Sequence, residues 1–179
     1  VQALRKDDTV LSDSGVAADR QFTAQVEQLL TLGYPTMANL TEDGFLNRIE
    51  PLRRVFELGA IIVIPEDVVT FAFQLEAIGG RVVSYNRTWT HGDSIKMPDV
   101  PFISTDVDDG RGYHERSPLN CLKHFQTSNR FGLTVMEGIA LITHRPKILR
   151  NYHCADLPGS YCGHELHTPQ LRHWGELIL

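Results

Sequence analysis

Basic residues are few in this sequence, and their scarcity argues against one class of partner. The chain of 179 residues has 17 Lys and Arg against 22 Asp and Glu, which gives a net charge of −5. Proteins that bind the phosphates of a nucleic acid normally concentrate Lys and Arg in a patch, whereas here the basic residues are scattered. We therefore predict that the protein has no nucleic-acid partner.

Long apolar runs and abundant cysteines are also missing. The longest apolar run, GAIIVI at residues 59–64, is far shorter than the roughly 18 to 20 residues of a membrane-spanning helix. Three cysteines are too few for a secreted disulfide scaffold, and the first residues do not have the pattern of a signal peptide. We predict a cytoplasmic protein that does not enter a membrane.

Several well-known catalytic and nucleotide-binding signatures are absent as well. The sequence contains no GxxxxGK followed by Ser or Thr, no GxGxxG after a predicted strand, no GxSxG and no HExxH. The closest approach is GHELH at residues 163–167, whose two histidines are only three residues apart. The sequence therefore does not indicate a P-loop nucleotide hydrolase, a dinucleotide-binding enzyme, a serine hydrolase or a zinc metalloprotease.

The residues that are present predict a single α/β domain. Residues 1–18 show no sustained periodicity and are predicted to form a loosely ordered N-terminal arm, which leaves residues 19–179 for the domain. Apolar residues at helical spacing predict a first helix capped by Asp19. A second helix is predicted after Thr41, with a break caused by Pro51.

The middle of the chain predicts a parallel βαβ core. AIIVI at residues 60–64 is a short run of β-branched residues, typical of a strand that is covered on both faces. A helix is predicted over residues 66–80 and further strands over 81–85 and 101–107. A strand, a helix and a second strand form a right-handed crossover, and the N-terminal helices are expected to pack on the resulting small sheet.

The last third of the chain is predicted to be helical and then extended. Ser117 followed by Pro118 is a typical helix start, and Thr134 with Glu137 forms a capping box ahead of a second helix. Residues 151–179 are rich in Gly, Pro and aromatic residues, and we predict hairpin strands there.

Several of these segments together resemble a known family. They are GAIIVIP, FISTDVDDG, RSPLN, LTVMEGIALITHRPKIL, and NYHC followed by GSYCG. The chain is similar over roughly residues 33–165 to an uncharacterised, mainly actinobacterial family that is known only as a domain of unknown function. The resemblance implies a bacterial origin, and the family has no known activity that could be carried over to this chain.

Cysteines and histidines are dense in NYHCADLPGSYCGHELH at residues 151–167. Thiolate and imidazole are the usual ligands of structural zinc, although the spacing here is not that of a zinc knuckle. The alternatives are ordinary packing of the cysteines and a Cys154–Cys162 disulfide, which a reducing compartment disfavours. The candidate zinc ligands are His153, Cys154, Cys162, His164 and His167, with His173 as a further candidate.

The register of the predicted hairpin decides which of these ligands share a face. If Pro158-Gly159 form a two-residue loop, one face carries His153, Cys162 and His164. If the loop has three residues, Cys154 replaces His153 in that set. A fourth ligand would have to come from elsewhere in the chain.

Acidic residues follow the third predicted strand, where a different chemistry is expected. Ligands of open α/β sheets collect at the carboxyl ends of strands, and Asp106 and Asp108 lie just beyond that end. If the neighbouring loops cover the same edge, His91 or His114 could act as a general base beside these carboxylates. The alternative is a solvated turn, because Asp and Gly are common in turns.

Two functions follow from these sites. The first is a bacterial accessory or binding protein with a structural zinc in the hairpin. The second is a small-molecule enzyme that uses Asp106, Asp108, His91 and His114 for acid/base or metal-assisted chemistry. The sequence identifies neither a substrate nor a protein partner.

Overall fold

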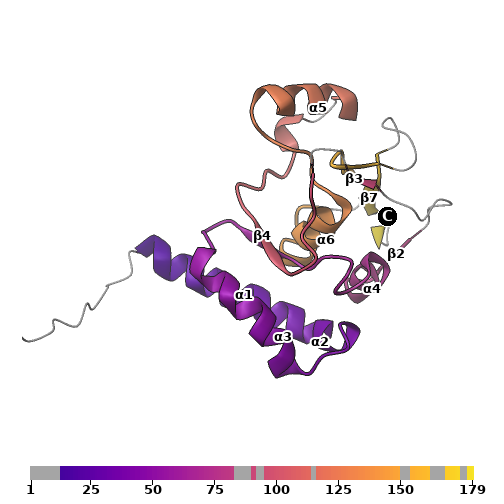
Figure 1. Ribbon diagram of the computed structural model, residues 1–179. Helices are drawn as coiled ribbons and strands as arrows, with labels where there is room; N and C mark the ends of the chain where they lie inside the picture. The colour runs from indigo at the N-terminus through magenta and orange to yellow at the C-terminus, as the bar shows by residue number, and fades with distance from the viewer. Residues whose placement is uncertain are drawn as a thin grey trace, which may run out of the picture.

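The structure is a computed structural model, and it describes residues 13–82, 90–91, 95–113, 116–149, 154–161, 168–173 and 177–179. The N-terminal helices are α1 (Asp13–Thr31), α2 (Tyr34–Met37), α3 (Glu42–Ile49) and the 3-10 helix η1 (Glu50–Val55). They lie together at one end of the molecule, and α5 lies at the other (Figure 1). The fold is of the predicted α/β class.

Local sequence signals explain how α3 begins and ends. The Thr41 hydroxyl accepts a hydrogen bond from the backbone N–H of Gly44 at 3.1 Å and caps the helix, as predicted. The α-helix ends at Ile49, and the chain continues as η1 because Pro51 has no N–H to donate to an α-helical carbonyl.

The first helix is longer than the sequence analysis expects. It begins at Asp13, so residues 13–18, assigned above to a loosely ordered arm, are helical. Asp19 is not its cap but lies inside α1, where its carboxylate pairs with Arg53 of η1 at 2.6 Å. The guanidinium of Arg53 also lies over the ring of Phe22, 4.4 Å from its centre.

The strand β1 (Ile61–Val63) divides the interior into two packed clusters. Ile61 and Val63 point into one cluster, and Ile62 and Ile64 point into the other. All four side chains are at most 2% exposed. This alternation confirms the prediction of a strand that is covered on both faces. The N-terminal helices cover one side and α6 (Val135–His144) the other.

The pairing of the strands differs from the predicted parallel core. β1 pairs antiparallel with β4 (Phe102–Ser104), and the next strand, β2 (Gly80–Arg81), belongs to a different sheet. The helix between them, α4 (Phe71–Ala77), therefore connects two sheets instead of crossing over one. The predicted βαβ unit is wrong in this respect, because the order of elements along the chain does not determine which strands pair.

The edge of β1 opposite β4 is closed by side chains. Gln25 of α1 donates from its amide nitrogen to the carbonyl of Ala60 at 2.8 Å and accepts from the N–H of Ile62 at 2.9 Å. His144, at the end of α6, lies 3.0 Å from the carbonyl of Ile62 through its Nε2 atom. These side chains supply the hydrogen bonds that a further strand would make.

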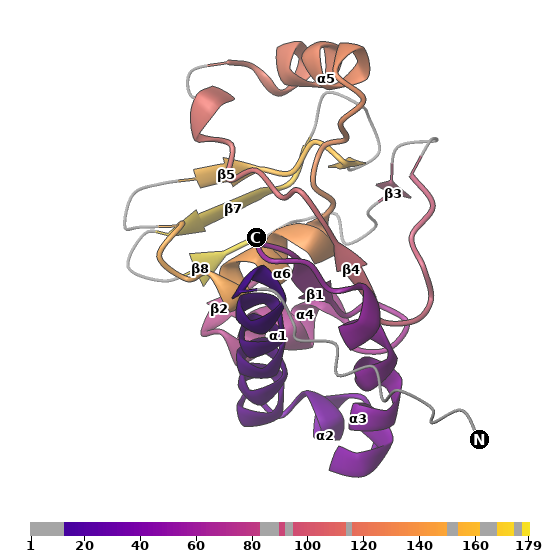
Figure 2. The same cartoon turned by 90° about the vertical axis from the view of Figure 1, so that its left-hand side faces the viewer.

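The C-terminal strands form most of the second sheet. Its order is β2, β8 (Leu177–Ile178), β7 (Gln170–His173) and β5 (Cys154–Asp156), with β2 parallel to β8 and the other pairs antiparallel. A third, two-stranded sheet joins β3 (Thr90–His91) to β6 (Ser160–Tyr161). Figure 2 shows β5, β7 and β8 side by side, with β8 next to α6.

The predicted hairpin around Pro158-Gly159 is therefore only a turn. The carbonyl of Leu157 accepts from the N–H of Ser160 at 3.1 Å, as in a two-residue β-turn. The two flanks then separate, because β5 pairs with β7 and β6 pairs with β3. The first flank pairs with β7 over three residues, and the second pairs with β3 over two.

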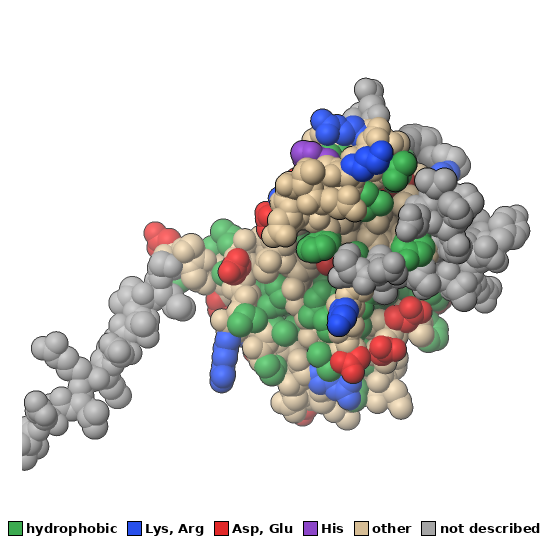
Figure 3. All heavy atoms as spheres, turned by 45° about the horizontal axis from the view of Figure 1, so that its top comes forward, with side chains coloured by type: hydrophobic (Ala, Val, Ile, Leu, Met, Phe, Trp, Pro, Cys, Tyr) green, Lys and Arg blue, Asp and Glu red, His purple; other side chains and the backbone are tan. Residues whose placement is uncertain are grey.

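Helix caps in this half of the chain agree with the sequence. Ser117 caps α5 (Pro118–Thr127), and Thr134 and Glu137 form the capping box of α6. Within the described ranges, every helix is too short or too polar to span a bilayer. On the face shown in Figure 3, acidic and basic side chains are interspersed and form no single basic patch.

Candidate functional site

A cavity of about 1220 Å³ lies between α5 and the body of the molecule. One wall comes from residues 106–130, which we call the α5 segment; it contains the 3-10 helix η2 (Arg111–Tyr113) and α5. The opposite wall comes from α6 and the strands β5 and β7. Figures 1 and 2 show α5 standing apart from the other helices on this side.

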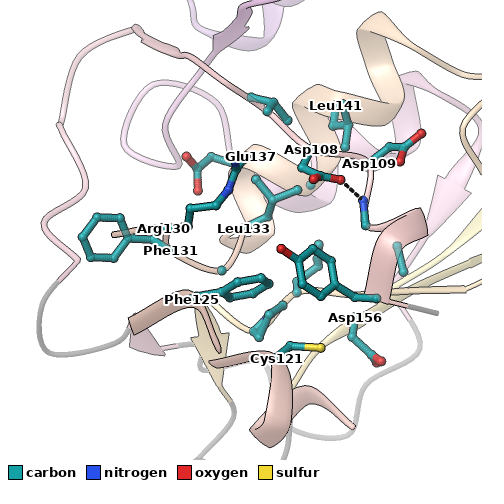
Figure 4. A pocket seen from close by; sticks show the side chains of 18 of the residues that line it. Asp108, Asp109, Cys121, Phe125, Arg130, Phe131, Leu133, Glu137, Leu141 and Asp156 are labelled. Carbon is teal, nitrogen blue, oxygen red and sulfur yellow. Dashed lines mark hydrogen bonds between the residues drawn. The ribbon is translucent and has the colours of Figure 1, made fainter. Parts of the chain in front are cut away.

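The inside of the cavity is mainly apolar. Cys121 and Phe125 of α5 lie on one side and Leu141 of α6 on the other (Figure 4). Most of the aliphatic lining residues belong to the edge of the main apolar core, so core side chains pack against them on the side away from the cavity. The principal apolar lining residues are Phe125, Leu133, Leu141, Ile142, Leu157 and Leu171.

The two ends of the α5 segment contact each other. The guanidinium of Arg130 contacts the carboxylate of Asp106 at 3.0 Å and donates to the carbonyl of the same residue at 2.7 Å. Asp106 has a left-handed backbone with φ of 51°, and Asn129 has φ of 53°. Asp and Asn tolerate this conformation better than most residues, and here it lets the chain leave the body and return at neighbouring points.

Aromatic contacts give the α5 segment a small core of its own. The ring of Tyr113 lies 5.1 Å from that of Phe125 in an edge-to-face arrangement and 5.6 Å from that of His124. The guanidinium of Arg116 lies 5.7 Å from the centre of the Tyr113 ring. The segment thus has internal order that does not depend on filling the cavity beneath it.

Close backbone contact joins the segment after α5 to the turn at residues 158–159. The N–H of Gly159 donates to the carbonyl of Leu133 at 2.9 Å. A Cβ atom on Gly132 would lie 2.6 Å from the backbone nitrogen of Gly159, so only glycine permits this approach. Ser160 adds a hydroxyl that accepts from the N–H of Val135 at 3.0 Å. These contacts fix one end of the cavity.

Glu137 is the charged residue of α6 that faces the cavity. Its carboxylate accepts from the Ser104 hydroxyl at 3.0 Å and from both the N–H and the hydroxyl of Thr134 at 2.9 Å. The carboxylate therefore caps the helix and holds β4 against it. With its acceptor sites occupied, it serves structure more than proton transfer.

The acidic loop before η2 forms the rim of the cavity. Asp108 accepts from the N–H of Gly110 at 2.8 Å, as Figure 4 shows, and Asp109 contacts Arg111 at 3.0 Å. These are the turn interactions that the sequence analysis raised as the alternative to catalysis. Asp108 has no cationic partner among the residues that the structure describes.

Cys121, the buried cysteine of the cavity wall, is not activated as a nucleophile. Cys121 is 7% exposed, and burial raises the pKa of its thiol above the ordinary value of 9.0. The nearby Arg116 lowers this pKa and Asp156 raises it further. The thiol is therefore protonated at neutral pH, whereas a catalytic cysteine needs a lowered pKa.

Only some of the residues predicted for acid/base chemistry are among those that the structure describes. Asp106 and Asp108 both line the cavity. The backbone of His91 lies in β3 opposite Ser160, but its side chain and the whole of His114 lie outside the described residues. A catalytic role for these four residues stays a prediction.

The predicted zinc ligands are also only partly visible. Cys154 is an exposed, free cysteine in β5, opposite Arg172 of β7. His153, Cys162, His164 and His167 lie outside the described residues, as does the side chain of His173. In the part of the chain that is described, no three potential ligands lie close enough together to hold a metal ion. A zinc site stays a prediction, without the hairpin register on which it was based.

The α5 segment was not among the predicted sites. Cys121 is buried, with 7% exposure, and lines the cavity together with Phe125. A signal was present, because a spacing of four puts both side chains on the same face of α5. The partner of that face could not be deduced from the spacing.

Comparisons with known proteins support a family and nothing more specific. A model of a family of unknown function, DUF5701, matches residues 28–172. No curated protein and no solved structure matches the chain.

Proposed function

This chain belongs to the family of unknown function DUF5701, and from its cavity we propose that it is a binding protein that holds an elongated, largely apolar ligand between the α5 segment and α6. The observation that carries the proposal is a cavity of about 1220 Å³ with an aliphatic and aromatic wall. We further propose that it works in the bacterial cytoplasm.

The size of the cavity favours a ligand larger than a typical metabolite. Pockets for drug-sized molecules usually measure about 300–1000 Å³, and they are mostly apolar with a few polar groups that fix orientation. The present cavity is larger than this range. Like such pockets, it combines an apolar interior with a polar group, the carboxylate of Asp108, at its rim. Its ligand is therefore expected to be long and to have a polar end or side.

The chemistry of the lining favours binding over catalysis. The thiol of Cys121 is protonated, and the carboxylates of Asp106 and Glu137 are engaged by Arg130 and by capping donors. An enzyme site would need an activated nucleophile or a base within reach of an orienting partner. Asp106 and Glu137 therefore hold the walls of the cavity together.

A neutral fluorescent probe tests this proposal directly. N-phenyl-1-naphthylamine is apolar and becomes brighter when it leaves water, so we expect saturable binding with one site per chain. Leu133→Trp fills the cavity, and its expected effect is a loss of affinity of about tenfold or more. Leu58→Trp is the matched control, because Leu58 is 60% exposed and does not line the cavity.

Two results would count against the proposal. One is the absence of saturable probe binding to the wild-type chain. The other is equal affinity of the wild type and of Leu133→Trp, after circular dichroism has shown that the variant is folded.

The two sites predicted from the sequence keep their own tests. Zinc content of protein purified without a histidine tag tests the ligands at residues 153–167, since structural zinc sites are close to fully occupied. A substrate turnover assay comparing wild type with Asp108→Asn tests the acid/base site.

A further inference from the structure

One edge of the four-stranded sheet is open beside the cavity. The strand order places β5 at the end of the sheet, and within the described part of the chain only β7 pairs with it. The three residues of β5, Cys154 to Asp156, all line the cavity. The cavity therefore has a sheet edge as part of its wall as well as apolar side chains.

The register shows which backbone groups face this open edge. Leu157 donates its N–H to the carbonyl of Pro169 at 2.9 Å, so residues 157 and 155 form the hydrogen-bonded pairs with β7. The N–H and C=O groups of Cys154 and Asp156 then point away from β7. Among the described residues these groups have no hydrogen-bond partner.

An extended peptide fits this edge better than a folded partner does. The α5 segment lies across the cavity from β5, and the space between them is about 1220 Å³. A single extended strand can enter such a space, whereas the edge of another folded sheet brings its own layers with it. A peptide can also satisfy two donors and two acceptors with its main chain.

The two faces of β5 predict which side chains the peptide should have. Ala155 shares a face with Leu171 and Leu157, which pack toward α6, so a peptide residue on this face should be apolar. Asp156 points to the other face, where its carboxylate accepts a hydrogen bond from the amide of Gln170 and where Arg172 also lies. A basic side chain of the peptide would complement the charge of this carboxylate. In the wider lining, Asp106 pairs with Arg130 and Asp109 with Arg111. The lining charges outside these pairs are Asp108, Glu137 and Asp156 against Lys96 and Arg116, so acids are slightly in excess.

We propose that the ligand is an extended peptide that adds to β5 as a further strand, with apolar and basic side chains at alternate positions. The inference rests on the proposed binding function and names its ligand class. Main-chain hydrogen bonds to Cys154 and Asp156 supply affinity, and the apolar wall and the acidic rim supply selectivity. The α5 segment covers the bound strand.

Peptide selection on the full chain tests the proposal and does not require that a partner be identified first. A phage library of random octapeptides is selected on the immobilised protein, and the enriched sequences are synthesised. We expect enriched peptides to alternate apolar and basic residues and to displace N-phenyl-1-naphthylamine from the cavity. Displacement shows that the peptide and the probe share one site.

Backbone methylation then asks whether the peptide binds as a strand. An added strand bonds to β5 through every second residue, so only one set of alternate amides faces the edge. Two N-methylated versions of the best peptide are compared, one for each set. We expect one version to lose affinity by about tenfold or more and the other to stay within about threefold of the parent.

A pair of variants at one position supplies the matching test on the protein. Asp156→Pro removes an N–H that faces the cavity and leaves the ladder to β7 intact. Asp156→Ala keeps this N–H and removes only the carboxylate. Peptide affinity should fall by about tenfold or more for the proline variant and less for the alanine variant, while both bind the naphthylamine probe.

The outcomes separate this inference from the proposed function. If the probe binds but no selected peptide displaces it, the peptide proposal is overturned and the binding function stands. If neither the probe nor any peptide binds, the proposed function fails as well. If both methylated peptides bind equally well, strand addition is overturned in favour of binding through side chains. If sedimentation shows a dimer that Asp156→Pro dissociates, strand addition by a peptide is overturned in favour of a second copy of the chain.

Discussion

His144 is expected to make the stability of this protein depend on pH in the weakly acidic range. Burial lowers the pKa of its imidazole from 6.5 to about 4, and the neighbouring Arg145 lowers it further, while the Ile62 carbonyl acts in the opposite direction. The ring lies against β1, with Nε2 3.0 Å from that carbonyl. The folded protein therefore holds the imidazole in its neutral form.

The direction of this pH dependence follows from the number of protons that the folded and unfolded states bind. Between pH 6.5 and about 4, the unfolded chain carries a proton on this imidazole and the folded chain does not. The contribution to stability is fully present above pH 6.5 and is lost as the pH falls toward 4. The slope is about 1.4 kcal/mol for each pH unit, and the difference between the two pKa values corresponds to about 3 kcal/mol in total.

Urea unfolding of two proteins isolates this effect from the other titrating groups. The wild type and His144→Gln are unfolded at several values between about pH 7.5 and 4.5, and the free energy of unfolding is compared at each. Glutamine keeps a donor for the Ile62 carbonyl but does not titrate. We expect the wild type to lose about 2 to 3 kcal/mol relative to the variant at the acidic end.

A constant difference between the two proteins across this range would refute the reasoning. So would a pKa near 6.5 for the His144 ring in the folded protein, measured by NMR titration. Either result would mean that the imidazole is hydrated or that its protonated form is stabilised by contacts other than those described.

Three further predictions concern the packing that surrounds the cavity and β1. Gln25→Leu removes the amide that satisfies the carbonyl of Ala60 and the N–H of Ile62 at the start of β1, so we expect a loss of about 2 to 4 kcal/mol in urea unfolding, against less than about 0.5 kcal/mol for Glu27→Leu on the exposed side of α1. Gly159→Ala places a methyl group against the carbonyl of the facing glycine and should cost more than about 3 kcal/mol, whereas Gly112→Ala has open space and should cost less than about 0.5 kcal/mol. Thr134→Ala removes the cap of α6 and should cost about 1 to 2 kcal/mol, and an unchanged melting temperature would contradict the capping role.

The signals that worked in the sequence are those that act within a few residues. The caps at Thr41, Ser117 and Thr134 each satisfy a helical N–H within one turn, and the structure contains all three. Pro51 ends α3 because its ring and missing N–H act on the adjacent turn. Such effects depend only on residues that are close together in the chain, so they can be deduced from the sequence.

The start of α1 was missed for a reason that is also physical. Asp19 has the chemistry of a cap, but the same carboxylate is used by Arg53 from a distant part of the chain. The helix extends six residues before it, to Asp13. A cap preference amounts to about 1 kcal/mol, which the tertiary packing of α1 is enough to override.

The candidate site was less predictable than the helices. The sequence directed attention to Asp106 and Asp108, which do line the cavity, but only the structure shows that α5 belongs to the same wall and faces α6 and β5 across the cavity. It also suggested a hairpin at Pro158-Gly159, and only the turn itself forms there. Both errors concern which distant segments meet.

The sequence by itself determined the α/β class, the caps, the helix break at Pro51 and the burial of β1 on both faces. Only the tertiary structure decided that β1 pairs with β4, that β5 pairs with β7, and that β5 keeps an open edge beside a cavity. The physical reason is that turns and caps are set by bonds between near neighbours, whereas strand pairing depends on the total burial gained by alternative partners far apart in the chain. Which strands pair therefore depends on the packing of the whole core and not on any one segment.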